Sequence, residues 1–65
     1  MIFNGVDIGS VESTGVDGAK YQFQFLSKDF GKLPKDGIAP GSSAFELDTG
    51  EVYIFHGETK EWYKL

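Results

Sequence analysis

Apolar and polar residues alternate along several segments of this chain, and the alternation predicts β-strands. Residues 20–26, KYQFQFL, place Tyr21, Phe23 and Phe25 on one side and polar residues on the other, which is typical of a half-buried strand. Shorter stretches of the same pattern predict three more strands, at residues 43–47, 51–56 and 61–65. We expect these last three strands to form an antiparallel meander.

Three segments lack this alternation. The sequence IFNGVDI fits either a hairpin about Asn4-Gly5, because Asn-Gly suits a type I′ turn, or one edge strand bent at the glycine. The sequence GSVESTGVDG, residues 9–18, predicts a loop. Residues 27–42 contain both prolines and three glycines, so we expect a long connection without a helix.

The turn DTG, residues 48–50, allows two registers. A two-residue loop needs positive φ at both Thr49 and Gly50, which a β-branched residue resists. That loop gives the pairs Leu47–Val52 and Phe45–Ile54.

A three-residue loop, residues 48–50, places Gly50 alone in the left-handed conformation, and turn chemistry favours it. This loop gives the pairs Phe45–Tyr53 and Leu47–Glu51. Because a slip of one residue exchanges the two faces of a strand, the two registers bury different side chains.

The next hairpin predicts a single register. A four-residue loop at residues 57–60 gives the pairs His56–Glu61, Phe55–Trp62, Ile54–Tyr63 and Val52–Leu65. The central strand is then apolar on both sides, with an aliphatic side at Val52 and Ile54 and an aromatic side at Tyr53, Phe55 and Trp62. Either the chain covers both sides, or the aromatic side binds a partner, so these three aromatic residues are the candidate interaction face.

Size and composition limit how such a sheet is stabilised. A chain of 65 residues forms one domain, which buries only about 60 % of its unfolded surface. It has no cysteine and one histidine, so disulfides and a zinc site are excluded as staples. We therefore expect a single all-β domain over residues 1–65 with four or five antiparallel strands, as a rolled sheet or open barrel. Tyr21, Phe23 and Phe25 would lie across one face of the meander.

The net charge of −4 and the pI near 4.6 argue against binding nucleic acid or an anionic membrane surface. Met1 is followed by mixed polar and apolar residues, with neither a basic segment nor an apolar run of the kind found in signal peptides. We therefore expect synthesis in the cytoplasm of the producing cell.

Catalytic and cofactor motifs are weak or absent. His56 is the only imidazole, and it faces Glu61 as a surface pair, so we expect no enzyme. Glu46, Asp48 and Glu51 gather at one turn but lack the spacing of a calcium loop. Neither GxxxxGK[ST] nor GxGxxG occurs, so we expect no cofactor.

One loop offers a second candidate contact. It interleaves basic and apolar side chains at Lys28, Phe30, Lys32, Leu33 and Lys35. These five residues are either a small binding tip or, because Asp29 and Asp36 offset much of the charge, a solvated loop.

The segment from Pro40 to Leu65 carries a recurring hairpin pattern. Its elements are Pro40-Gly41-Ser42-Ser43, Asp48-Thr49-Gly50, Val52-Tyr53-Ile54-Phe55, Gly57 and Trp62. The pattern resembles short proteins of tailed bacteriophages and hairpin units of phage tail proteins. FLSKD at 25–29 and LP at 33–34 are similar to the upstream part of those proteins, whereas His56 departs from them, since an Asp is common there.

The resemblance implies a phage or prophage origin and a structural or accessory role in the virion, through binding another virion protein or through self-association. The alternative is a small acidic phage-encoded inhibitor or regulator that binds a host protein. Neither role requires a catalytic residue.

Overall fold

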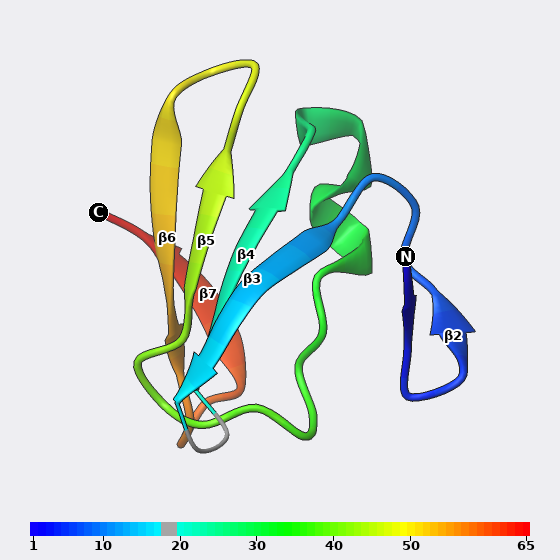
Figure 1. Ribbon diagram of the computed structural model, residues 1–65. Helices are drawn as coiled ribbons and strands as arrows, with labels where there is room; N and C mark the ends of the chain where they lie inside the picture. The colour runs from blue at the N-terminus through cyan, green and yellow to red at the C-terminus, as the bar shows by residue number, and fades with distance from the viewer. Residues whose placement is uncertain (18–19) are drawn as a thin grey trace.

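The computed structural model describes residues 1–17 and 20–65, without the side chains of residues 14–17, and shows an all-β protein (Figure 1). The all-β class predicted from the sequence is therefore confirmed. The described elements are β1 (Ile2–Phe3), β2 (Val6–Asp7), β3 (Glu12–Asp17), β4 (Lys20–Phe25), the 3₁₀ helix η1 (Ser27–Lys32), β5 (Ser43–Glu46), β6 (Glu51–His56) and β7 (Glu61–Lys64).

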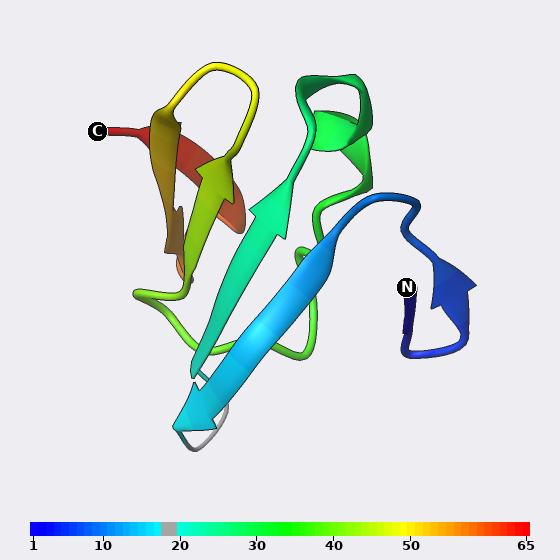
Figure 2. The same cartoon turned by 45° about the horizontal axis from the view of Figure 1, so that its top comes forward.

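Five strands form one sheet in the order β3-β4-β5-β6-β7, while β1 and β2 form a separate hairpin. The antiparallel C-terminal meander β5-β6-β7 is confirmed. β4 and β5 differ from the expectation because they pair in parallel, which requires a crossover; residues 26–42 supply it. Within the described residues the sheet is not closed into a barrel, and both ribbon views show β7 passing behind β5 and β6 (Figures 1 and 2).

The N-terminal segment forms the hairpin, not the single bent strand. Asn4 and Gly5 have φ values of 50° and 80°, and Phe3 pairs with Val6. Positive φ at both central positions is what a type I′ turn requires.

The predicted loop at residues 9–18 is wrong over 12–17, where β3 pairs antiparallel with β4 at the sheet edge. A register shift between Ser13 and Val16 interrupts the ladder, which explains why the sequence shows no regular alternation. Residue 18 of that predicted loop lies outside the described residues.

The expectation that residues 27–42 contain no helix is also wrong. A 3₁₀ helix needs only i to i+3 hydrogen bonds and suits short segments. The Asp29 amide donates to the Leu26 carbonyl at 2.8 Å, and the Leu33 amide donates to the Phe30 carbonyl at 3.2 Å. The helix ends at Lys32, before either proline, so the prolines do not oppose it.

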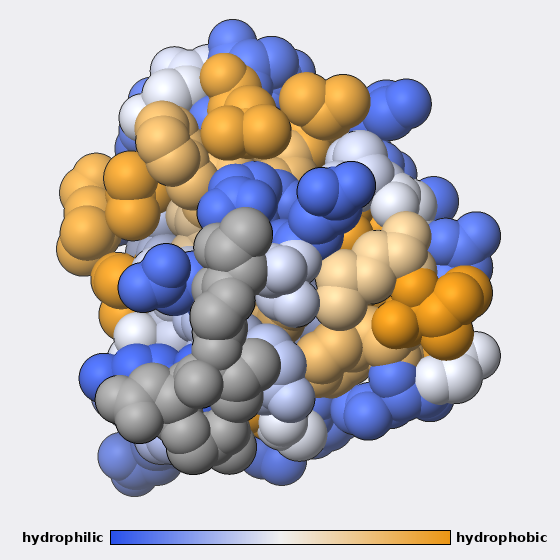
Figure 3. All heavy atoms as spheres, in the orientation of Figure 1, coloured by the Kyte–Doolittle hydropathy of each residue, from blue (hydrophilic) through white to orange (hydrophobic). Residues whose placement is uncertain are grey.

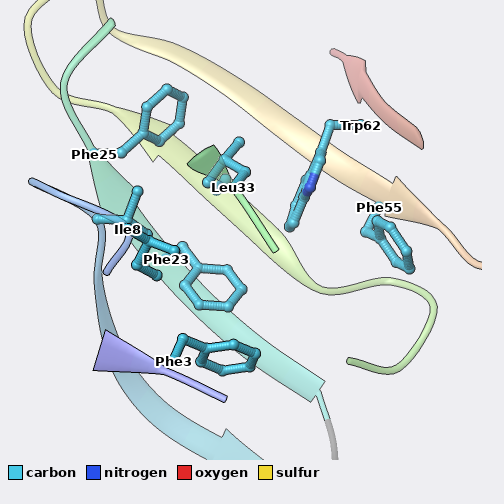
Figure 4. Close-up of a cluster of buried hydrophobic side chains, with 9 residues drawn as sticks. Phe3, Ile8, Phe23, Phe25, Leu33, Phe55 and Trp62 are labelled. Atoms are coloured by element: carbon cyan, nitrogen blue, oxygen red, sulfur yellow. The ribbon is translucent and has the colours of Figure 1, made fainter. Parts of the chain in front are cut away.

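The core lies on one side of the large sheet, which we call the inner side. Phe23 and Phe25 of β4 share this side with Phe55 of β6 and Trp62 of β7, and Figure 4 shows their side chains pointing into one cluster. Phe23 and Trp62 meet edge to face at a centroid distance of 6.0 Å, a favoured arrangement for aromatic rings.

The prediction that β4 covers one face of the meander is wrong. Tyr21, Phe23 and Phe25 do not lie across the meander, because β4 is a neighbouring strand in the same sheet. The cover comes instead from the N-terminal hairpin, the corner after it and the end of η1. Its buried apolar residues are Phe3, Ile8, Val11 and Leu33.

Ser42 positions the start of the parallel pair. It is fully buried, and its hydroxyl donates to the Ala39 carbonyl at 2.7 Å and accepts from the Tyr21 amide at 3.1 Å. One side chain therefore joins the end of the crossover to the start of β4.

The two meander turns have the same geometry. In each, a four-residue loop ends in a left-handed residue, Gly50 (φ 78°) or Lys60 (φ 55°). The amide of that residue donates at 2.8 Å to the carbonyl before the loop, at Glu46 or His56. The predicted β6–β7 register is confirmed by its pairs His56–Glu61, Phe55–Trp62 and Ile54–Tyr63.

Both predicted β5–β6 registers are wrong, because the loop has four residues and pairs Phe45 with Val52. The three-residue alternative was right about positive φ at Gly50 but placed Phe45 on the wrong face. The two-residue alternative placed Phe45 on the correct face, although its register is shifted by two residues.

We predict that Gly50→Ala lowers the free energy of unfolding by about 1 kcal/mol, because an L-residue is strained at positive φ. An added Cβ at Gly50 meets nothing within 4 Å, so backbone strain accounts for the change. Lys60→Ala is the matched control. Lys60 is itself an L-residue at positive φ, so its replacement by alanine adds no backbone strain and removes only the exposed ion pair with Asp36. Its effect should stay within about 0.5 kcal/mol in urea denaturation. Equal losses in the two variants would contradict the turn assignment.

Candidate interaction surfaces

The predicted interaction face is the core of the domain. Phe55 and Trp62 are only 3% and 8% exposed, and their ring centroids lie 5.2 Å apart. The Trp62 indole N–H donates to the Pro34 carbonyl at 3.0 Å, and Tyr53 is half-buried against Phe30 at 4.9 Å. The expectation of a free aromatic face is corrected, because the crossover and the N-terminal hairpin cover this side.

The opposite side of the meander is the one left open, and sequence reasoning did not choose it. We call it the outer face, defined by Phe45 of β5, Val52 and Ile54 of β6, and Tyr63 and Leu65 at β7. Phe45 and Tyr63 are 44% and 51% exposed, whereas Val52 and Ile54 are partly buried. Leu47 is also exposed at the adjoining turn. Figure 3 shows hydrophobic residues at the surface near the β5–β6 turn and near the C-terminus.

The signal for the outer face was present in the sequence. The β6–β7 register alone places Val52, Ile54, Tyr63 and Leu65 on one side. What the sequence did not show is which side the distant segments cover.

The candidate loop contacts do not form one binding tip. Leu33 is buried at 4% exposure, and Phe30 packs partly against Phe25 and Tyr53. Lys28, Lys32 and Lys35 are exposed. The ammonium of Lys32 lies 3.4 Å from an Asp29 oxygen, and that of Lys35 lies 3.3 Å from a Glu61 oxygen.

A cleft of about 460 Å³ lies between the β1–β2 hairpin and residues 31–36. Its apolar lining comes from Phe3, Val6, Ile8, Leu33 and Pro34. Lys32 and Lys35 line it together with Asp7 and Asp36, so its charges balance. This cleft is within the size range of ligand pockets, but its lining favours neither an anion nor a cation.

Asp29 joins η1 to the corner before β3. The Ser10 amide donates to its carboxylate at 2.9 Å, and the Ser10 hydroxyl accepts from the Leu26 amide at 3.1 Å. Hydrogen bonds from the Ser10 hydroxyl and amide, aided by Lys32, lower the pKa of Asp29 from 3.8 to about 2. A Cβ on Gly9 (φ 64°) would lie 2.8 Å from the same carboxylate, so this contact requires glycine.

The remaining polar candidates have local partners. The Ser27 hydroxyl and amide both donate to the Asp48 carboxylate, at 2.6 and 3.1 Å, and these bonds lower the pKa of Asp48. Glu46 accepts a hydrogen bond from the Thr49 hydroxyl, and Glu51 lies 3.6 Å from Lys64. These three carboxylates therefore stabilise the β5–β6 turn and its neighbours.

His56 lies at the exposed end of β6. Its Nδ1 is 3.4 Å from both the amide and the hydroxyl of Thr59, and its ring meets Tyr63 edge to face at 6.1 Å. Across the described ranges, 1–17 and 20–65, no three His, Cys, Asp or Glu side chains are grouped in a way that could hold a metal ion.

No helix among the described residues is long and apolar enough to cross a membrane. Comparisons with protein-family models, curated proteins and solved structures found no match for this chain.

We predict that acid removes stability supplied by Asp29. Because the pKa of Asp29 is lower in the folded state, its contribution is present above pH 3.8 and is lost as pH falls toward 2. Asp29→Asn should be less stable than the wild type at pH 7, and the difference should shrink between pH 4 and pH 2, measured by urea denaturation.

Ser10→Ala is the control for the cause of this shift. It removes the hydroxyl donor, so the Asp29 pKa, followed by NMR of the carboxyl carbon, should rise toward its ordinary value. An unchanged pKa in Ser10→Ala, or the same pH profile in Asp29→Asn and wild type, would contradict the assignment.

Proposed function

We propose that this protein is a non-enzymatic structural or accessory component of a tailed-phage particle, and that it acts by binding protein through the outer face. The observation that carries the proposal is the exposed apolar surface of the meander at Phe45, Tyr63 and Leu65. Contiguous exposed apolar patches on small proteins usually mark interaction sites.

The chemistry of this surface favours a protein partner. The five side chains of the outer face carry no charge. Gln22 and Gln24 of β4 extend the same side with polar, uncharged groups, and the pair His56–Glu61 borders it toward the β6–β7 turn. Nucleic acid and anionic lipid are bound mainly by clustered lysine and arginine. Four of the six basic residues pair instead with carboxylates, at distances of 3.0–3.6 Å.

The particle role rests on the resemblance of the hairpin pattern in residues 40–65 to proteins of tailed phages. Its residues have structural tasks here: Asp48 accepts from Ser27, Gly50 adopts positive φ, and Trp62 donates to Pro34. A pattern of this kind preserves a hairpin scaffold and leaves the outer face free for binding. These structural tasks support a structural component of a particle more than an enzyme.

The proposal predicts that the chain is present in particles purified from the phage or lysogen that encodes it. Quantitative mass spectrometry of density-purified particles should find several copies per particle. Phe45→Lys, introduced into that genome, should reduce incorporation at least tenfold.

Val6→Lys is the matched control, because Val6 is also an exposed apolar residue (60%) but lies on the separate β1–β2 hairpin. It should be incorporated like the wild type. Absence of the wild-type chain from particles, with stable binding to a host protein in the lysate instead, would overturn the particle role in favour of an inhibitor or regulator.

A further inference from the structure

The side chains of the outer face are arranged in rows fixed by the strand registers. One row runs Phe45, Val52, Leu65, since Phe45 pairs with Val52 and the Leu65 amide donates to the Val52 carbonyl at 2.9 Å. The next row runs Ser43, Ile54, Tyr63. Bulky side chains thus flank Val52 on both sides. Ile54 has the bulky Tyr63 on one side and the small Ser43 on the other, so the surface is lower at Ser43.

This layout is compatible with a two-fold arrangement. Consider two copies stacked with their outer faces together and related by a two-fold axis that runs parallel to β6. The outer side chains of β5 in one copy then lie over those of β7 in the other. Phe45 then meets Leu65 of the second copy, and the large Tyr63 meets the small Ser43. Each row therefore pairs with its own counterpart, as an isologous interface requires.

The area of the face also fits. Aromatic side chains present roughly 150–250 Å² each, so the exposed fractions of Phe45 and Tyr63 leave about 100 Å² of each uncovered. With Leu47, Leu65 and the partly buried Val52 and Ile54, the exposed apolar area is on the order of 400–500 Å². A standard interface needs about 450 Å² of apolar area per partner, because it buries about 800 Å² that is about 57 % apolar.

We infer that the outer face binds a second copy of this chain, giving a two-fold dimer in which the two meanders stack face to face. This inference rests on the proposed interaction role, since it names the partner of the same surface. The dimer buries the apolar surface that the meander leaves exposed at Phe45, Tyr63 and Leu65. Each copy carries a net charge of −4, so repulsion opposes the dimer and added salt strengthens it.

The test is analytical ultracentrifugation of the purified chain from low micromolar to about millimolar concentration, a range that covers weak and moderate dimers. The apparent mass should rise from 7.2 kDa toward twice that value, and the transition should move to lower concentration in higher salt. Phe45→Lys should raise the dissociation constant at least tenfold, although it lowers the net negative charge. Val6→Lys, with the same change in charge, should dimerise like the wild type.

A chain that stays monomeric throughout this range at both salt concentrations overturns the inference. Dimerisation that Phe45→Lys leaves unchanged overturns it too, because the contact would then lie elsewhere. Circular dichroism of both variants confirms that they are folded. If the chain is monomeric but Phe45→Lys is lost from particles, the second-copy inference fails and the particle role stands. If the chain dimerises but is absent from particles, the second-copy inference stands and the particle role fails.

Discussion

The structure depends on one constraint: the meander is apolar on both sides, and the described residues cover only one of them. The side that is covered is aromatic, and Trp62 is its anchor, because its ring packs on Phe23 and Phe55 while its indole N–H donates to Pro34. This hydrogen bond holds the crossover over the sheet. The uncovered side then becomes the outer face, so the position of the core decides where binding can occur.

The cover is held by a few polar contacts between distant segments. Asp29 accepts from Ser10, which joins η1 to the corner before β3, and Asp48 accepts from Ser27, which joins η1 to the β5–β6 turn. Ser42 performs the same task at the other end of the crossover. A small domain without disulfides thus uses hydrogen bonds, part-buried at Asp29 and Ser42 and exposed at Asp48, to fix loops that supply part of its core.

Local pattern was sufficient for the elements of the meander but not for how they assemble. The alternation in KYQFQFL predicted β4, and the four-residue loop after His56 gave the correct β6–β7 register. β3 escaped detection because a register shift interrupts its alternation. The parallel pairing of β4 with β5 was missed, although the long connection predicted at residues 27–42 has the length that a parallel crossover needs.

The local sequence pattern also could not predict which side of the meander forms the core. It depends on Phe3, Ile8 and Leu33, which come from segments far from the meander in sequence. Since either side of β6 is apolar enough to be buried, only these long-range contacts separate core from surface. The aromatic face predicted for binding was therefore the face that folding used.

Trp62 is the only tryptophan in the chain, so its fluorescence reports directly on which side of the meander is covered. With Trp62 only 8% exposed, the account predicts blue-shifted emission and weak quenching by acrylamide in the native protein, and strong quenching after unfolding in urea. Native emission and quenching equal to those of the unfolded chain would show that the aromatic side is open, and would contradict the assignment of core and outer face.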